Sequence, residues 1–224
     1  MTERLDRSQV AWRIAQDIPD GSYVNLGIGQ PELVANYLPL GVEIILHSEN
    51  GILGMGPDPG PNERDFDLVN AGKKPVTLLP GGSFFHHADS FAIVRGGRLD
   101  LCVLGAYQVG ANGDLANWST GAADAIPAVG GAMDIAVGAK RCVVMTEHTT
   151  RDGAAKLVAA CTYPLTAVGV VKTVYSDLAV VDLDADGFVV REIAPGVTIE
   201  ELRAKTGAAL RVAPTCGTIG APSL

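Results

Sequence analysis

The sequence lacks the features that mark membrane, nucleic-acid-binding and disulfide-stabilised proteins. No apolar run approaches the roughly 20 residues that a membrane span needs, and the charged residues 1–7 do not resemble a secretory signal. Only four cysteines occur, and they are widely spaced. The formal net charge of −8 argues against nucleic acid or an anionic membrane as a partner. We therefore expect a cytoplasmic protein with reduced thiols.

Aromatic residues are also scarce, at 5% of the sequence, whereas hydrophobic residues reach 47% and glycines number 27. This composition excludes disorder and a coiled coil, and it favours a buried sheet with many tight turns. The 224 residues show no internal repeat and no long linker, so we predict one α/β domain over residues 1–224. Strands that alternate with short helices predict a mainly parallel sheet flanked by helices.

The expected elements follow from capping residues, apolar periodicity and turn residues. Helices are expected after Asp6, which forms a capping box with Gln9, after the turn Gly27-Ile28-Gly29 with Pro31 in the first position, and over 90–94, 132–139 and from Thr198 to near Gly207. Strands are expected over 22–26, 42–46, 75–79, 99–104 and 141–145, and a C-terminal hairpin over 178–182 and 188–192.

The segment His47 to Pro57 follows an apolar run directly and contains a carboxylate, Glu49, and three glycines. A glutamate in such a place is commonly a solvated loop charge or a helix cap. A buried strand before it and an apolar, glycine-rich segment after it would leave it poorly solvated, which is typical of a reactive carboxylate. The glycines at 51, 54 and 56 would then leave backbone amides free to face a ligand.

Residues 48–57 resemble the active-site motif of the B subunit of 3-oxoacid CoA-transferases, in which the glutamate is the nucleophile. Further segments resemble the same family in the same order: 25–29, 67–73, 95–97, 104–106, 113–118, 130–134 and 163–166. The resemblance implies the CoA-transferase fold, which is similar to ribose-phosphate isomerase. It also implies covalent, ping-pong transfer of CoA through a glutamyl-CoA thioester at Glu49.

An acyl-transfer site needs hydrogen-bond donors for its tetrahedral oxyanion. The family resemblance and an expected helix start indicate the backbone amides of Gly130 and Gly131. Asn50 or the turn containing Gly27 and Gly29 would form a further wall. The alternative for each glycine is a tight turn needed only for packing.

His86 and His87 are expected on a strand, where adjacent side chains point to opposite sides, so we expect no shared metal site. Residues 84–91, 119–122 and 126–131 resemble the 3-oxoadipate branch of the family. Its substrates carry a distal carboxylate, so we predict that His86 or His87 binds that group, with Arg95 as a weaker candidate. The alternatives are structural histidines and a surface arginine.

The family resemblance also implies a separate A subunit, an A2B2 heterotetramer, and succinyl-CoA and a 3-oxoacid as substrates. No cofactor is expected, because the CoA esters are themselves substrates. Two alternatives stay open. One is the same chemistry on acetoacetate or another 3-oxoacid, and the other is a sugar-phosphate isomerase or a ligand-sensing domain of the same architecture.

Overall fold

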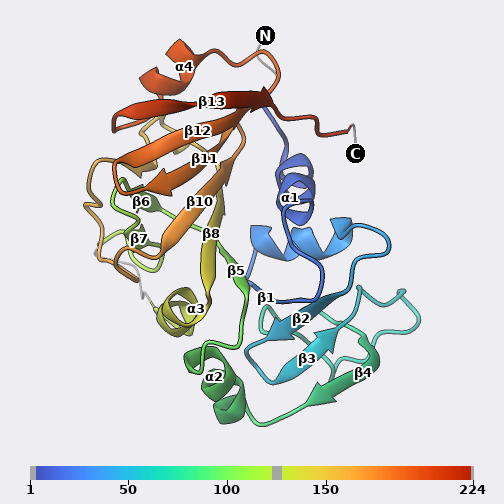
Figure 1. Cartoon of the computed structure of the whole chain (residues 1–224). Helices are drawn as coiled ribbons and strands as arrows, with labels where there is room; N and C mark the ends of the chain where they lie inside the picture. The colour runs from blue at the N-terminus through green and yellow to red at the C-terminus, as the bar shows by residue number, and fades with distance from the viewer. Residues whose placement is uncertain (1–3, 123–127, 223–224) are drawn as a thin grey trace.

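In the computed structural model, which describes residues 4–122 and 128–222, one ten-stranded sheet crosses the whole molecule (Figure 1). In spatial order its strands are β13 (Leu210–Thr218), β12 (Gly187–Ile193), β11 (Ala179–Asp184), β10 (Val171–Ser176), β8 (Arg141–Thr146), β5 (Leu101–Leu104), β1 (Ser22–Leu26), β2 (Ile44–Ser48), β3 (Ile52–Met55) and β4 (Leu78–Phe84). The five central strands from β10 to β2 are parallel. β3 and β4 extend one side antiparallel, and β11 and β12 extend the other.

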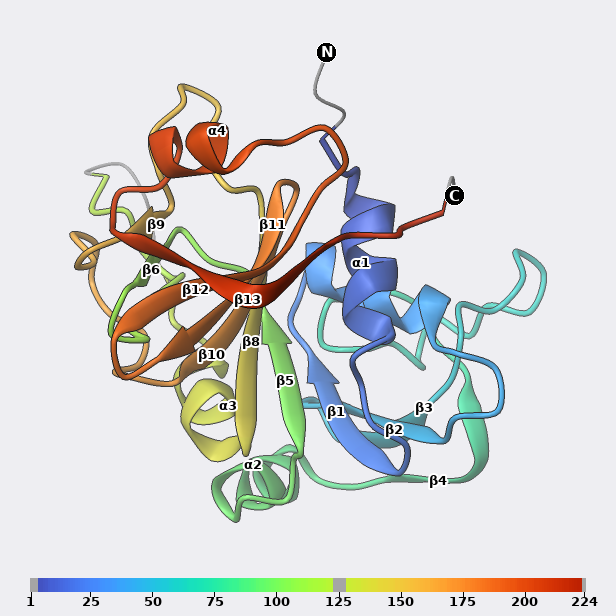
Figure 2. The same ribbon diagram turned by 45° about the horizontal axis from the view of Figure 1, so that its top comes forward.

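Helices and a small second sheet cover the two faces of the large sheet (Figure 2). The helices are α1 (Arg7–Ala15), the 3₁₀ helix η1 (Gln30–Tyr37), α2 (His87–Arg95), α3 (Ala132–Gly138) and α4 (Ile199–Ala204). The small sheet has the order β7 (Leu115–Ala116), β6 (Gln108–Gly110) and β9 (Leu157–Val158). The mainly parallel α/β fold with a C-terminal hairpin and helix is confirmed. None of the helices in the described ranges is both long and apolar enough to cross a membrane.

Alternate residues of the central strands serve two different hydrophobic cores. Val143 and Met145 of β8 pack into the core beneath α1 and η1. Cys142 and Val144 point to the opposite face and pack with α2, α3 and the small sheet. This follows from the two-residue period of a strand, which places neighbouring side chains on opposite faces. The central strands are therefore buried on both sides.

The local signals at the N-terminus give the predicted structure. Asp6 accepts a hydrogen bond from the Gln9 amide at 2.8 Å, and the Gln9 side chain accepts one from the Asp6 amide at 3.0 Å. This capping box satisfies two amides that the first turn of α1 leaves unpaired. Val10 and Ile14 are buried one turn apart on the face toward the sheet. Helix η1 contains Pro31 in its first turn, as expected, but its geometry is 3₁₀.

The chain departs from the expected pattern between residues 51 and 87. The segment expected as an open loop is strand β3 over Ile52–Met55, and the Gly51 and Gly56 amides donate to Ser48 O at 2.9 Å and to Thr77 O at 2.8 Å. A Cβ on Gly54 would lie 2.8 Å from the Gly82 Cα, so this glycine permits close packing of β3 and β4. The predicted strand position of His86 and His87 is wrong. His86 caps α2, because its Nδ1 accepts from the Ala88 amide at 3.1 Å, and His87 begins the helix.

Two parts of the sequence prediction lie partly outside the described residues. Residues 1–3 belong to the charged N-terminal segment, and residues 126 and 127 belong to a segment that resembles the 3-oxoadipate branch. The sequence signals do not predict the C-terminal edge of the sheet. β13 pairs in parallel with β12 and closes that side, after α4 has carried the chain back along the sheet.

Candidate active site

Glu49 lies in a three-residue turn that joins the parallel strand β2 to the antiparallel strand β3. Ser48 pairs with Ile52 across this hairpin, and the Gly51 amide donates to Ser48 O at 2.9 Å. Gly51 has φ +116°, and a Cβ there would lie 2.1 Å from the carbonyl oxygen of Phe85. Only glycine fits this position without displacing the neighbouring backbone. The hairpin therefore fixes where the Glu49 backbone lies at the carboxyl edge of the sheet.

A buried asparagine on the neighbouring strand holds the Glu49 carboxylate. Asn25 of β1 is fully buried, and its Nδ2 donates to Glu49 Oε2 at 3.0 Å. The same nitrogen lies 3.2 Å from His47 Nδ1 and 3.3 Å from His47 O. Asn25 Oδ1 is buried and has no hydrogen-bond partner among the described residues. The Asn25 amide thus contacts both the Glu49 carboxylate and His47 of β2, the strand that precedes Glu49.

His47 supports Asn25 from behind and is itself buried. Burial lowers the pKa of this imidazole to about 4, so the ring is neutral at neutral pH. Its Nδ1 can accept from the Asn25 amide only if Nε2 carries the proton, which then points to Ser90 Oγ at 2.8 Å. Ser90, on α2, is fully buried as well. A chain of polar groups therefore runs from α2 through His47 and Asn25 to Glu49.

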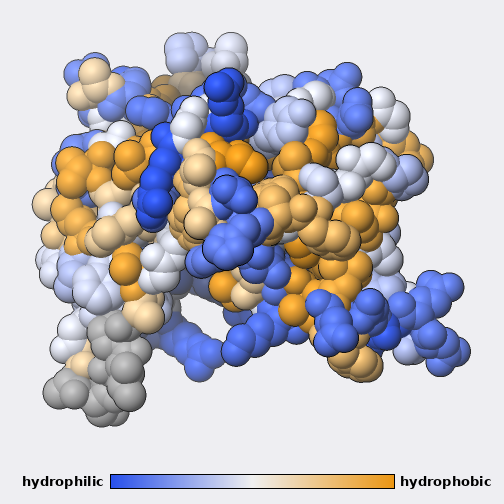
Figure 3. Space-filling view, turned by 90° about the horizontal axis from the view of Figure 1, so that it is seen from below, coloured by the Kyte–Doolittle hydropathy of each residue, from blue (hydrophilic) through white to orange (hydrophobic). Residues whose placement is uncertain are grey.

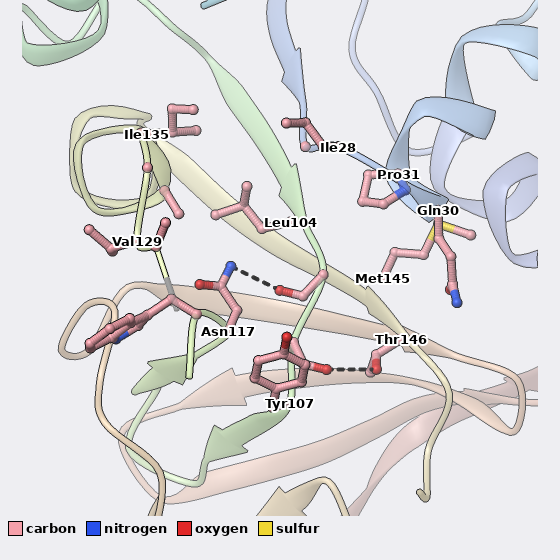
Figure 4. Close-up of a pocket in the computed structure, with 18 of the residues that line it drawn as sticks. Ile28, Gln30, Pro31, Leu104, Tyr107, Asn117, Val129, Ile135, Met145 and Thr146 are labelled. Atoms are coloured by element: carbon pink, nitrogen blue, oxygen red, sulfur yellow. Dashed lines mark hydrogen bonds between the residues drawn. The ribbon is translucent and has the colours of Figure 1, made fainter. Parts of the chain in front are cut away.

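Two hollows meet at Glu49. The inner cavity, of about 480 Å³, lies at the carboxyl ends of β1, β5 and β8 (Figure 4). Its wall contains Leu104, Tyr107, Asn117, Ile135 and Thr146, and the Asn117 amide donates to Gly105 O at 3.1 Å. The outer hollow, of about 500 Å³, is more open and lies against α2 and α3. A carboxylate shared by two hollows can face a different ligand on each side.

Of the four glycines predicted near Glu49, three line a hollow beside it and one does not. Gly130 and Gly131 line both hollows, together with Glu49. Gly131 also allows close packing, because a Cβ there would lie 2.6 Å from the ring of Phe91. Gly27 lines the inner cavity, but its amide already donates to Val103 O at 2.8 Å. Gly29 lines neither hollow and donates its amide to Glu32 Oε2 at 2.9 Å.

The polar side chains predicted near the site lie on the outer side. Asn50 and His87 line the outer hollow, and Asn50 Nδ2 donates to Val69 O at 2.7 Å. His86 is exposed and does not line either hollow. Arg95 lines the outer hollow, but its guanidinium forms two hydrogen bonds with Asp134, at 2.8 and 2.9 Å. No group of three histidine, cysteine or acidic side chains within the described ranges is arranged to hold a metal ion.

The sequence prediction does not single out Asn25, Glu147 or Lys156. Asn25 carries a usable signal, since it is a polar residue inside an apolar strand. Glu147 and Lys156 line the inner cavity, as Glu49 does, and come from the end of β8 and the segment before β9. No local pattern links them to Glu49, because only the folded sheet brings them to one edge.

The Glu147 carboxylate is held by several partners. Burial alone would raise its pKa, but hydrogen bonds from Gln30 and Arg7 and the charge of Lys156 outweigh burial and lower the pKa to about 2. Gln30 Nε2 and an Arg7 nitrogen each lie 2.9 Å from Glu147 Oε1. Glu147 is therefore ionised at neutral pH and ties α1 and η1 to the end of β8.

Comparison with known proteins agrees with this geometry. The sequence profile described as coenzyme A transferase matches residues 7–205. The chain belongs to the coenzyme A transferase family. This transferase is 58% identical to the B subunit of 3-oxoadipate CoA-transferase from Acinetobacter baylyi over 92% of the chain and 95% of that protein. It is 57% identical to the protein of the same name from Pseudomonas putida, over 94% of the chain and 98% of that protein.

Solved structures share the fold of this transferase at low sequence identity. An acyl-CoA transferase, YdiF, from Escherichia coli O157:H7 matches 97% of the chain with a TM-score of 0.75 at 21% identity. The transferase spans only 44% of that longer chain. Glutaconate coenzyme A-transferase from Acidaminococcus fermentans matches the whole chain and 92% of its own length, with a TM-score of 0.69 at 18% identity.

Proposed function

We propose that this chain is the catalytic B subunit of a CoA-transferase that moves CoA from succinyl-CoA to 3-oxoadipate, with Glu49 as the nucleophile. The observation that carries the proposal is the position of Glu49, on a rigid hairpin, held by Asn25 and open to two hollows. The choice of 3-oxoadipate as acceptor is supported by the higher sequence identity to relatives named for that acid. Those named as B subunits of 3-oxoadipate CoA-transferase are 57–58% identical, whereas one named for 3-ketoacids, from Bacillus subtilis, is 47% identical.

The proposed reaction conserves the thioester through four steps. Glu49 attacks the thioester carbonyl of succinyl-CoA, which forms an acyl-glutamyl anhydride and releases the CoA thiolate. The thiolate then attacks the Glu49 carbonyl, which forms glutamyl-CoA and releases succinate. The acceptor carboxylate attacks glutamyl-CoA and expels the thiolate, which finally takes the acyl group and restores Glu49. Each half uses the same covalent intermediate, so the kinetics would be ping-pong.

The surroundings of Glu49 suit this chemistry. Asn25 leaves one carboxylate oxygen, Oε1, outside the Asn25 hydrogen bond and orients it as the attacking atom. Gly130 and Gly131 lie where both hollows meet Glu49, so we propose their amides as oxyanion donors. Removal of one such donor typically slows acyl transfer by about 10²–10³-fold.

We further propose an A2B2 assembly with a separate A subunit, in the cytosol. The names of the relatives, as B subunits, support a partner chain. The face seen from below in Figure 3 has apolar patches between polar groups, and Phe84, Met133 and Val137 are exposed on elements at this end. Exposed apolar area of this kind is typical of an interaction surface. Cys102 and Cys142 are register partners on adjacent strands, and in the proposed reducing compartment they would remain thiols.

Covalent trapping tests the proposed function. The chain is copurified with its A subunit, incubated with succinyl-CoA, reduced with borohydride and analysed by mass spectrometry. We expect reduction of a glutamyl thioester at Glu49 and no modification in Glu49→Ala. An intact complex that gives no modification would overturn the nucleophile assignment and favour the isomerase or sensor alternative.

A further inference from the structure

We propose that Lys156 binds the distal carboxylate of the dicarboxylic substrates, at the end of the inner cavity opposite Glu49. This inference rests on the proposed function and adds a residue that recognises the acid. Lys156 lines the inner cavity, and its side chain is only 14% exposed. It is the only lysine or arginine among the described residues that line this cavity. In both half-reactions only one end of the substrate reacts at Glu49, so the distal carboxylate remains charged and needs a cationic partner.

The ammonium group of Lys156 has a fixed position with donor capacity to spare. Its Nζ donates to Thr146 Oγ1 at 3.0 Å, and Thr146 Oγ1 in turn donates to Ala106 O at 3.2 Å. Its distance to Glu147 Oε2 is longer, at 3.5 Å. An ammonium has three donors, so a further acceptor can be bound without breaking the bond to Thr146. Figure 4 places Thr146 beside Tyr107 in the wall of the cavity.

The nearby Glu147 does not cancel the charge of Lys156. Arg7 donates to Glu147 Oε1 from two nitrogens, at 3.2 and 2.9 Å, and Gln30 donates to the same oxygen. Arg7, Lys156 and Glu147 therefore sum to one positive charge at this end of the cavity. A single carboxylate from the substrate would neutralise it, which favours a dicarboxylate over a monocarboxylic acid.

The spacing of the sheet suits a short dicarboxylic acid. Glu49 follows β2, whereas Thr146 ends β8, and the order β2, β1, β5, β8 puts three strand spacings between them. Three spacings amount to about 14 Å between the two backbones at this edge. A glutamate side chain from one end and a lysine ammonium at the other leave room for an extended acid of about four to six carbons. Leu104 and Ile135 give the wall an apolar surface for its methylene groups.

The other side chains that the sequence suggests for this carboxylate, Arg95 and His87, are less well placed to bind it. Arg95 is 63% exposed and forms its two hydrogen bonds with Asp134. His87 is exposed and borders the outer hollow. The dicarboxylic acid therefore binds in the inner cavity, and the CoA arm occupies the more open outer hollow.

The test compares two inhibitors that differ only in the distal carboxylate, adipate and hexanoate. Each is titrated against 3-oxoadipate with the copurified complex at fixed succinyl-CoA, and the ratio of the two inhibition constants is measured. We expect the wild type to bind adipate about 10- to 100-fold more tightly, which is the range for a hydrogen bond to a charged group. In Lys156→Met this ratio should fall close to one, and Lys156→Arg should keep most of the preference.

Acceptor kinetics give a second measurement with matched controls. In a ping-pong reaction, kcat/KM for the acceptor reports only the second half-reaction. We expect Lys156→Met to lower kcat/KM about 10- to 100-fold for 3-oxoadipate and to change it little for acetoacetate. Lys140→Met is the control, because Lys140 is 63% exposed and pairs with Asp100 beyond the opposite end of β8. A thermal melt of each complex verifies folding.

Three results would overturn the proposal while leaving the transferase function intact. They are an unchanged adipate-to-hexanoate ratio in Lys156→Met, an equal loss for both inhibitors, and a collapse of the ratio in His87→Ala instead. Failure of the wild-type complex to transfer CoA would overturn the proposed function itself, so the two failures are distinguishable.

Discussion

Asn25 Nδ2 donates a 3.0 Å hydrogen bond to Glu49 Oε2, which joins two adjacent parallel strands at the edge of the sheet where the hollows meet. Asn25 is fully buried, and it contacts the cavity-lining Glu49 through this hydrogen bond. The bond therefore acts on the orientation of Glu49.

Replacement of Asn25 by alanine should slow the reaction much more than it weakens substrate binding. The variant removes a hydrogen bond to a charged group, so we expect kcat to fall about 10- to 100-fold with KM for succinyl-CoA nearly unchanged. Steady-state kinetics of the copurified complex measure both values. Asn112→Ala, at an exposed turn, is the control. A rise of KM with kcat unchanged would show that Asn25 acts in binding instead.

Replacement of Gly51 by alanine should destabilise the Glu49 hairpin through a steric clash. The added Cβ would lie 2.1 Å from Phe85 O, so the backbone of one segment must move. Gly21→Ala is the matched control, because Gly21 also has positive φ, at +72°, but an added Cβ there would meet no atom within 4 Å. We expect about 1–2 kcal/mol of destabilisation from conformation alone at Gly21, and a clearly larger loss at Gly51. Urea unfolding checks both, and equal losses would contradict the clash.

Two buried histidines should make the chain less stable as the pH falls below 6.5. Burial lowers the pKa of both His47 and His148 to about 4, and the charges of Lys205 and Arg4 add to the effect at His148. The unfolded imidazoles bind protons with their ordinary pKa near 6.5, so the unfolded state binds more protons between pH 6.5 and 4. The free energy of unfolding should therefore decrease in this window, by up to about 1.4 kcal/mol per pH unit for each histidine.

Urea unfolding at several pH values between about 7.5 and 5 measures this slope. His148→Gln retains polar atoms near Ser176 and Thr206, which the ring contacts at 2.9 and 2.8 Å. It should be less stable than the wild type at neutral pH and should show a shallower pH slope. A slope identical to that of the wild type would mean that His148 does not contribute.

The sequence predicts those parts of the fold that depend on local signals. The Asp6 capping box, strand β1 at Ser22–Leu26 and the C-terminal hairpin each rest on a few neighbouring residues. The hairpin turn is confirmed by Gly187, which has φ +100°. Such signals are local because they arise from backbone conformation and nearest-neighbour hydrogen bonds.

The parts that the sequence does not predict depend on distant segments. Glycine at position 54 suggests an open loop, but it is needed because β4, which begins at Leu78, packs against it. His86 and His87 are expected on a strand, whereas the cap formed by the His86 side chain begins α2 instead. Lys156 cannot be placed near Glu49 without the strand order, since half of the chain separates them in the sequence.

Successive side chains of β8 point to opposite faces of the sheet and pack in different cores, so the length of the strand determines which face each residue reaches. Cys142, Val144 and Thr146 share one side of the strand, and Val143 and Met145 share the other. Insertion of one residue within β8 would reverse the side on which the residues after it point, which would turn Thr146 toward the side of α1 and remove its hydroxyl from the Lys156 ammonium. Insertions in the exposed loop at 150–154 would not change the face to which each side chain of β8 points. The strand therefore tolerates changes of residue type far better than changes of length.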